Sequence, residues 1–225
     1  GDRLVGKVAI VTGAGSGSEG VGIGQAIAVL LAREGAKVLI VDVDEARASR
    51  TVAMIEDEDG EAFDHVTDVT SSEQCSDAVE VAVRKFGGLH VLINNVGVSG
   101  EGSVVDVTEQ HYQHVLDVNL KSMVLMAKHA IPVMIRSGGG SIVNLSSIVG
   151  MRAGAFGAAI PYAVSKGGVI ALTSAMAVDH GTDGVRVNCI APGHVYTAMV
   201  ADRVDERLRD LRRRAGPLQT EGMAW

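Results

Sequence analysis

The chain has 225 residues, of which 47% are hydrophobic and 21% charged, and its formal net charge is −7. This composition is typical of a folded globular protein rather than a disordered one. The length favours a single domain over residues 1–225. The acidic balance argues against a nucleic-acid or anionic-membrane binder, because either partner favours a basic face.

Cysteine usage and targeting signals narrow the class of protein further. Cys75 and Cys189 are too few for a disulfide scaffold, and their spacing fits no zinc motif. Charged residues interrupt every hydrophobic stretch before it reaches the roughly 20 residues that span a bilayer. No signal-peptide pattern precedes the first strand-like run. We therefore expect a cytoplasmic protein with no metal site and no membrane partner.

Short β-branched runs alternate with longer segments of helical periodicity along the chain. Strands are expected at Lys7–Thr12, Lys37–Asp42, Leu89–Asn94, Ser141–Ser146 and Val185–Ile190, and helices at Gly24–Glu34, Asp44–Glu58, Ser72–Phe86, Glu109–Ser137 and Tyr162–His180. This alternation predicts an α/β fold, a single Rossmann-type doubly wound parallel sheet with helices on both faces. Ala201–Arg214 is expected to form a solvated helix with one narrow apolar edge, and no further strand is expected before Trp225.

A glycine-rich turn follows the first expected strand. Thr12-Gly13-Ala14-Gly15-Ser16-Gly17 leads toward a helix that begins near Ile23-Gly24. Backbone N–H groups at such a turn can reach a pyrophosphate, although glycine-rich turns also serve tight packing alone. Asp42 ends the second strand, where a carboxylate binds ribose hydroxyls and repels a 2′-phosphate. Because no Arg or Lys lies in the turn or directly after Asp42, the sequence favours NAD over NADP.

Tyr162 and Lys166 lie four residues apart, on one face of an expected helix. A nearby ammonium stabilises a phenolate and lowers the tyrosine pKa toward the range of a general base. The pair alone is weak, since Tyr-x-x-x-Lys occurs by chance in many helices. However, Ser146-Ser147 ends one buried strand and Asn94-Asn95-Val96-Gly97 ends another, so polar groups converge at the carboxyl edge of the sheet.

In this order, the motifs resemble those of the short-chain dehydrogenase/reductase family over nearly the whole chain. The matching residues are Thr12, Gly13, Asp42, Asp68-Val69, Asn94-Asn95-Val96-Gly97, Asn119, Ser147, Tyr162, Lys166 and Pro192-Gly193. The resemblance implies a sheet of seven parallel strands and a catalytic set of Asn119, Ser147, Tyr162 and Lys166. Ser147 is preferred to Ser146, which is expected to support the site from behind, because Ile148-Val149-Gly150 follows it.

The resemblance also implies a role for each of these residues. Tyr162 would be the general base in alcohol oxidation and the acid in ketone reduction, and Ser147 would bind the substrate oxygen. Lys166 would bind the nicotinamide ribose, and Asn119 would hold a water that links Lys166 to solvent. The implied cofactor-binding residues are Gly13, Ser16, Gly22, Ile23, Gly24, Asp42, Asp68, Val69, Asn95, Gly97, Tyr162, Lys166, Pro192, Gly193, Val195 and Thr197.

Several features depart from the family pattern. Ser18-Glu19-Gly20-Val21 enlarges the glycine turn, and Val96 replaces the usual alanine. The stretch from Ser147 to Tyr162 is slightly long, which places Ala153–Ile160 in a loop beside the substrate. The last helix and strand of the family do not follow Trp225, and we expect that this sequence omits such a tail.

Together these observations predict an NAD-dependent oxidoreductase that interconverts a secondary alcohol and a ketone by hydride transfer. The apolar residues Met151–Ile160 and Met199 suggest a lipophilic or cyclic alcohol, or a 3-hydroxyacyl group, as the small-molecule substrate. The alternatives are an NADP-linked 3-oxoacyl-carrier ketoreductase and a non-catalytic NAD-binding scaffold. The expected helices Glu109–Ser137 and Tyr162–His180 match those that pair in family dimers and tetramers, so a homo-oligomer, a homotetramer in particular, is expected.

Overall fold

The computed structural model describes residues 1–16, 20–152, 159–201 and 204–225. These residues form a six-stranded parallel sheet with the order β3-β2-β1-β4-β5-β6. The strands are β1 (Val8–Thr12), β2 (Lys37–Asp42), β3 (Ala62–Val66), β4 (Val91–Asn94), β5 (Gly140–Leu145) and β6 (Val185–Ile190). The expected doubly wound fold is confirmed.

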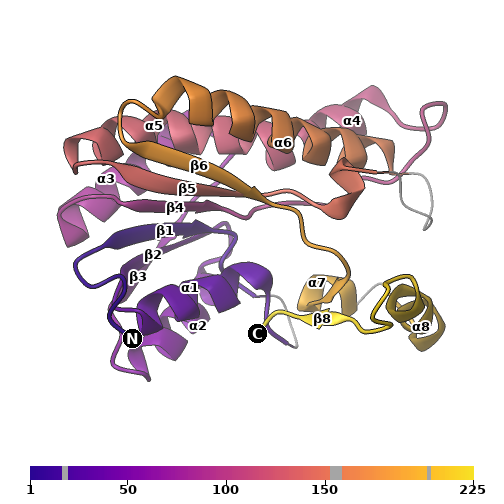
Figure 1. The fold of residues 1–225 in the computed structure, drawn as a ribbon, viewed down its shortest axis with the longest axis horizontal. Coiled ribbons are helices and arrows are strands. Elements are labelled where there is room, and N and C mark those ends of the chain that lie inside the picture. The colour runs from indigo at the N-terminus through magenta and orange to yellow at the C-terminus, as the bar shows by residue number, and fades with distance from the viewer. Residues whose placement is uncertain (17–19, 153–158, 202–203) are drawn as a thin grey trace.

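Helices cover both faces of the sheet (Figure 1). One layer contains α1 (Ile23–Arg33) and α2 (Glu45–Glu56); the other contains α3 (Ser72–Phe86), α4 (Glu109–Leu116), α5 (Ser122–Arg136) and α6 (Ile160–His180). A π-helical segment, η1 (Asp117–Lys121), joins α4 to α5, and a short 3₁₀ turn, η2 (Ile148–Gly150), follows β5. The expected helix Glu109–Ser137 is therefore three consecutive helical elements.

The pattern of side chains along the strands explains the two layers. Ile10 and Leu92 are fully buried in the core between the sheet and the layer of α3 and α5. Val11 and Ile40 are fully buried on the opposite face, in the core that includes residues of α1 and α2. Because both faces are covered, the central strands are apolar without alternation, as in other parallel sheets.

Two parts of the architecture differ from the expectation. Strand β3 was not predicted, because it lies at an edge and carries polar side chains such as Asp64 and His65.

Beyond β6, the chain forms β7 (Val195–Tyr196), α7 (Ala198–Ala201), α8 (Glu206–Arg214) and β8 (Gly222–Met223). β7 and β8 pair in parallel, so the expectation of no strand after the last helix was wrong. The resemblance implied a sheet of seven strands, whereas the sheet in the described residues has six.

The direction in which strands are added to the sheet reverses between β1 and β4. β2 and β3 lie on one side of β1, and β4, β5 and β6 lie on the other. In open sheets of this kind, ligands bind at the carboxyl ends of the strands beside this reversal. The glycine turn after β1, Asp42 at the end of β2 and the segments after β4 and β5 all lie at this edge.

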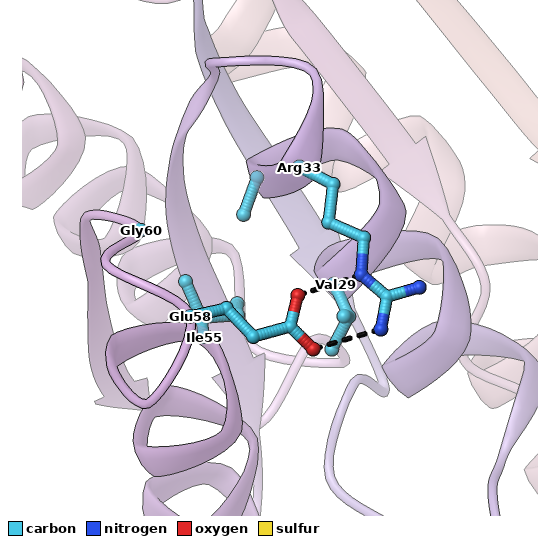
Figure 2. A pocket seen from close by; sticks show the side chains of 6 residues that line it. Val29, Arg33, Ile55, Glu58 and Gly60 are labelled. Atoms are coloured by element: carbon cyan, nitrogen blue, oxygen red, sulfur yellow. Dashed lines mark hydrogen bonds and ion pairs between the residues drawn. The ribbon is translucent and has the colours of Figure 1, made fainter. Parts of the chain in front are cut away.

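A small cavity of about 20 Å³ lies between α1 and α2, far from that edge. Figure 2 shows the Arg33 and Glu58 side chains facing each other across it, with Nε of Arg33 2.6 Å from Oε2 of Glu58. Arg33 ends α1, and helices that follow strands end at the amino edge of a parallel sheet. This ion pair therefore joins α1 to the end of α2 and belongs to the packing of the fold.

One segment, Glu109–Arg136, is 28 residues long and apolar enough to cross a bilayer by length and composition. Sequence analysis found no such run, because the charged residues Asp117, Lys121 and Lys128 interrupt the apolar residues of this segment. Half of the most apolar part of this helix is buried inside the protein, as in a core helix.

Candidate active site

The glycine turn after β1 brings two backbone segments into close contact. Gly13 has φ +62°, a conformation that favours glycine. A Cβ atom on Gly24 would overlap the carbonyl oxygen of Gly13, so only glycine fits at this start of α1. Among the described residues, no side chain caps the N-terminus of α1 at Gly22, and its first turn contains no acidic residue. The N–H groups of this turn therefore suit a negatively charged group such as a pyrophosphate.

Asn95 joins the end of β4 to the glycine turn. Its Nδ2 donates hydrogen bonds to the carbonyl oxygens of Thr12 (3.1 Å) and Gly13 (2.9 Å). The backbone N–H of Asn95 donates to Oγ1 of Thr12 (3.1 Å), which itself donates to the carbonyl of Ile93 (3.3 Å). The Asn95 side chain thus fixes the shape of the turn, a role that sequence analysis did not foresee when it gave Asn95 as a cofactor-binding residue.

Asp42 holds the other side of the glycine turn. Its Oδ2 accepts a hydrogen bond from the N–H of Gly15 (2.9 Å), and its Oδ1 accepts one from the N–H of Asp44 (3.2 Å). These bonds fix a half-buried carboxylate at the end of β2, next to the turn. The residues present fit a dinucleotide: a glycine turn with close backbone contact, an open helix N-terminus and a carboxylate where a ribose would lie.

Two arginines of α2 also face this turn, and sequence analysis missed them. Nη2 of Arg50 donates a hydrogen bond to the carbonyl of Ser16 (2.9 Å). A Cβ atom on Gly15 would lie only 2.7 Å from Cβ of Arg47. The spacing of three residues along α2 could have revealed this shared face, since residues three apart are neighbours on a helix.

Tyr162 and Ser147 meet at the carboxyl end of β5. Tyr162 lies in the first turn of α6, and Ser147 directly precedes η2, where its Oγ accepts a hydrogen bond from the N–H of Val149 (3.3 Å). Burial raises the pKa of Tyr162 above its ordinary value, and a side-chain hydrogen bond with Ser147 acts in the opposite direction. The structure therefore brings the Tyr162 phenol and the Ser147 hydroxyl together.

Lys166 is buried behind Tyr162. Its side chain is only 4% exposed, and its Nζ donates a hydrogen bond to the carbonyl of Leu145 (2.7 Å). Burial lowers the pKa of Lys166 to about 8, while the neighbouring Cys189 acts in the opposite direction. Nζ lies 5.8 Å from the centroid of the Tyr162 ring. The expected lowering of the Tyr162 pKa by Lys166 is not found, because the ammonium is directed at the Leu145 carbonyl and burial of the phenol dominates.

Asn119 is fully buried in the π-helical segment η1. Its Oδ1 accepts a hydrogen bond from the N–H of Val98 (2.7 Å), and its Nδ2 donates to the Val98 carbonyl (2.9 Å) and to Oγ of Ser165 (3.1 Å). A Cβ atom on Gly97 would lie 3.3 Å from Nζ of Lys166 and 3.5 Å from Oδ1 of Asn119. The Asn119 amide and the Lys166 ammonium therefore both lie next to Gly97.

The loop after β5 fixes the start of α6. Oγ of Ser146 donates a hydrogen bond to the carbonyl of Lys166 (2.7 Å). A Cβ atom on Gly150 would collide with the backbone of Lys166 and Gly167, so this contact requires glycine. Ser146 thus holds the helix that carries Tyr162, in the supporting position that the sequence suggested for it.

The remaining expected cofactor residues lie around the same edge of the sheet. Asp68 is exposed, and its Oδ1 accepts a hydrogen bond from the N–H of Thr70 (2.8 Å), whereas the Val69 side chain is buried in the core. The carbonyl of Pro192 accepts a hydrogen bond from the N–H of Ile148 (3.0 Å), next to Ser147. Gly193, Val195 and Thr197 follow in the segment that forms β7 and enters α7, and Ile23 is the first residue of α1.

Some expectations concern residues that the structure does not describe. Ser18 and Glu19 of the enlarged glycine turn lie outside the described ranges, as do residues 153–158 of the loop that was expected beside the substrate. The side chain of Met199 is likewise outside them.

Comparisons with known proteins agree with this geometry. A sequence model of the short chain dehydrogenase family matches residues 7–208. The chain is 36% identical over 208 residues to the 3-oxoacyl-acyl-carrier-protein reductase FabG of Thermotoga maritima, covering 92% of this chain and 81% of the relative. It is 40% identical over 202 residues to a mitochondrial borneol dehydrogenase of Lavandula x intermedia (89% and 73%), and 36% identical over 197 residues to cyclohexanol dehydrogenase of Acinetobacter sp. (87% and 76%).

Solved structures show the same likeness. A short-chain dehydrogenase/reductase from Burkholderia xenovorans has a TM-score of 0.94 and 37% identity, covering 100% of this chain and 87% of that one. A short-chain alcohol dehydrogenase from Sinorhizobium meliloti has a TM-score of 0.90 and 34% identity, covering 99% and 86%. The chain belongs to the short-chain dehydrogenase/reductase family and is an oxidoreductase that uses a nicotinamide dinucleotide to act on CH–OH groups.

Proposed function

We propose that this protein is an NAD-preferring dehydrogenase that interconverts an alicyclic secondary alcohol and the corresponding ketone. The observation that carries the proposal is the shared site of Tyr162 and Ser147, with the buried ammonium of Lys166 behind the phenol. A phenol and a hydroxyl that converge on one point can hold a single substrate oxygen between them.

The chemistry follows from these positions. In the oxidation, the substrate hydroxyl lies between Tyr162 and Ser147, and the Tyr162 oxygen accepts its proton as the phenol passes its own proton to the route behind it. Ser147 donates a hydrogen bond to the same oxygen and stabilises the negative charge that develops there. When bound, the nicotinamide ring supplies the acceptor for the hydride that leaves the carbinol carbon. The carbon–oxygen bond becomes a carbonyl, and in the reduction Tyr162 returns the proton.

Lys166 and Asn119 would supply the proton route behind Tyr162. A lysine whose pKa is about 8 exchanges protons readily near neutral pH. A Cβ atom on Gly97 would lie within 3.5 Å of both Oδ1 of Asn119 and Nζ of Lys166, so a water beside this glycine would contact both groups. Lys166 would also bind the nicotinamide ribose, with its ammonium held in place by the Leu145 carbonyl.

Asp42 supports the preference for NAD. Its carboxylate is fixed beside the glycine turn by two backbone N–H groups, and a negative charge at this position repels a 2′-phosphate. Gly13, Gly22, Ile23 and Gly24 would bring the backbone close to the pyrophosphate, with Ser16 beside them. Arg50 donates a hydrogen bond to the Ser16 carbonyl, and its positive charge offsets part of the repulsion between Asp42 and a 2′-phosphate. NADP therefore stays a second candidate.

The substrate class rests on the relatives. Their names include borneol dehydrogenase, cyclohexanol dehydrogenase and a 2,5-dichloro-2,5-cyclohexadiene-1,4-diol dehydrogenase, which all name cyclic alcohols. The FabG relative favours a second candidate, the NADP-linked reduction of a 3-oxoacyl group on a carrier.

We also propose a homo-oligomer, a tetramer in particular, built through α5 and α6. Val124 of α5 and Val164 and Val178 of α6 are exposed, although helices of a monomer usually turn apolar side chains inward. Light scattering of the purified protein gives the mass of the assembly, and a monomer would overturn this proposal.

A substrate panel tests the proposed function. The purified protein is assayed with NAD and NADP on cyclohexanol and borneol, and with NADH and NADPH on a 3-oxoacyl thioester. Turnover of the cyclic alcohols with NAD supports the proposal, and faster turnover of the thioester with NADPH supports the second candidate. Dinucleotide binding without turnover of any panel member would contradict both and favour a non-catalytic scaffold.

A further inference from the structure

The C-terminal part of the chain forms one wall of a cavity on the glycine turn. The cavity has a volume of about 240 Å³ and a largely apolar lining. Gly20 and Val21 of the turn line one side, and Tyr196, Thr197, Met223, Ala224 and Trp225 line the other. Thr197 is one of the cofactor-binding residues that the family resemblance implies. The space over the turn is therefore bounded by a segment that is far away in the sequence.

We call residues 194–201 and 204–225 the C-terminal cover. It contains β7, α7, α8 and β8, and Figure 1 shows these elements apart from the sheet, on the side of α1 and α2. Its position relative to the glycine turn thus depends on contacts within the cover and on a few contacts with the rest of the protein. One such contact is that of the Arg33 guanidinium with the Trp225 ring, 5.3 Å from its centroid.

Hydrophobic packing does not fix α8 within the cover. None of the nine residues of α8, all of which the structure describes, is buried. Leu211, on its narrow apolar edge, is 49% exposed. Since most helices in proteins are held by an apolar face, α8 needs another attachment.

Glu221 provides this attachment. Its side chain is only 3% exposed, and its two oxygens accept hydrogen bonds from Nε of Arg209 (3.0 Å) and from Nε of Arg212 (2.9 Å). The same guanidinium groups reach β7: Nη2 of Arg212 donates to the Val195 carbonyl (3.2 Å), and Arg209 lies 3.7 Å from the centroid of the Tyr196 ring. One carboxylate thus links α8 to both strands of the cover. The expectation that this whole helix face is solvated was wrong for Arg209 and Arg212.

We propose that Glu221 is a positioning residue that holds α8 on β7 and β8 and thereby keeps the segment Val195–Thr197 over the glycine turn. The inference rests on the proposed function, because it takes the space under this segment as part of the dinucleotide site. Loss of the carboxylate leaves the positive charges of Arg209 and Arg212 side by side without their anion, and like charges repel. The cover then opens more often, and a bound dinucleotide leaves faster.

The helix offers a matched control on its other side. Asp210 pairs with Arg213 (3.6 Å) and Arg214 (2.8 Å), and the side chains of these three residues are at least 40% exposed. Exposed ion pairs contribute little to stability. Asp210→Asn therefore removes the same charge from the cover without removing the link to β7 and β8.

Hydrogen exchange of the protein without dinucleotide tests the link itself. In Glu221→Gln, we expect the amides of residues 194–201 and 206–214 to exchange about tenfold faster than in the wild type, while Asp210→Asn leaves them unchanged. Trp225, the single tryptophan of the sequence, should show emission at longer wavelength in Glu221→Gln as its surroundings become wetter. Equal exchange in both variants and the wild type would overturn the proposal.

Two further measurements cover the remaining outcomes. If Glu221→Gln does not fold, Arg209→Gln, which removes one of the two ion pairs of Glu221, should speed exchange of the same amides, and no change would overturn the proposal. Stopped-flow release of NADH should be about five- to tenfold faster from Glu221→Gln than from Asp210→Asn, since the cover lies on the site. Equal release rates despite faster exchange would contradict the cover's role. Absence of dinucleotide binding in the wild type would contradict the proposed function instead, and the exchange rates would still decide whether Glu221 holds α8.

Discussion

Nζ of Lys166 donates a 2.7 Å hydrogen bond to the carbonyl oxygen of Leu145, the last residue of β5. This bond directs a buried ammonium at the end of the strand that leads directly to Ser146 and Ser147. The phenol of Tyr162 lies one helical turn away on the same helix. The arrangement joins the strand end, the Ser147 hydroxyl and the Tyr162 phenol, the two proposed catalytic groups, into one unit.

Replacement of Tyr162 by Phe removes the group that transfers the proton while keeping the ring in place. We expect turnover of the best panel alcohol to fall by roughly 10²–10⁴-fold, the usual contribution of a positioned acid–base group. Dinucleotide affinity, measured by calorimetry, should change little. Tyr112→Phe on α4 is the matched control, and an equal loss in both variants would contradict the assigned role.

Lys166 should make the stability of the fold depend on pH. Its pKa is lowered from 10.5 to about 8 by burial. The folded protein therefore loses the proton first, the unfolded chain binds more protons between these values, and stability rises with pH across this window. Below about pH 8 the buried charge costs up to about 3 kcal/mol.

Urea denaturation of the wild type and of Lys166→Met checks this prediction. Near about pH 7, the variant should be the more stable protein, because it buries no charge. The lost hydrogen bond to Leu145 reduces this gain by about 1 kcal/mol. The difference should shrink between about pH 8 and about pH 10. A constant difference over this range would show that the Lys166 pKa is not lowered.

Gly22 and Gly24 should respond differently to replacement by alanine. A Cβ atom on Gly24 would overlap the Gly13 carbonyl, so Gly24→Ala should lower the free energy of unfolding by roughly 1–3 kcal/mol. A Cβ atom on Gly22 would have Oγ of Ser16 as its nearest neighbour, at 3.7 Å, which is an ordinary contact. Gly22→Ala should therefore fold normally. It should nevertheless weaken dinucleotide binding, since the added methyl group faces the expected pyrophosphate. Thermal melts and calorimetry separate the two effects, and unchanged binding in Gly22→Ala would argue against a pyrophosphate there.

Asp42 and Arg50 should act on cofactor choice in opposite directions. Asp42→Asn removes a charge that repels a 2′-phosphate, so the ratio of NAD to NADP affinity should fall by about tenfold. Arg50→Gln keeps an N–H donor for the Ser16 carbonyl but removes the positive charge, so NADP affinity alone should fall. Calorimetric titration with both dinucleotides provides the numbers. Parallel losses for NAD and NADP in Arg50→Gln would mean that this side chain only fixes the turn.

Much of the fold was predictable from local patterns. The central strands are covered on both faces, so each is a continuous apolar run, and their ends carry the motif residues Gly13, Asp42 and Ser147. The edge strand β3 escaped prediction because the polar residues Asp64 and His65 interrupt its apolar run. Strands β7 and β8 escaped it for another reason: each is only two residues long, which is too short to show a pattern.

The candidate site shows a similar division. The proposed catalytic residues could be picked out of the sequence because their order and spacing along the chain are specific. The contacts that hold the site together could not be predicted. Asn119 is held by a π-helical turn and by the Val98 backbone, and Glu221 is held by two arginines one turn apart on another element. Contacts between distant segments leave no spacing pattern in a sequence.

In the proposed reaction, a secondary alcohol gives up a hydride from its carbinol carbon. Cyclohexanol with deuterium at this carbon, incubated with the protein and NAD, tests it directly. We predict that mass spectrometry finds the deuterium in the reduced dinucleotide, and that Tyr162→Phe transfers it far more slowly. Reduced dinucleotide without deuterium, or equal transfer by Tyr162→Phe, would contradict the account.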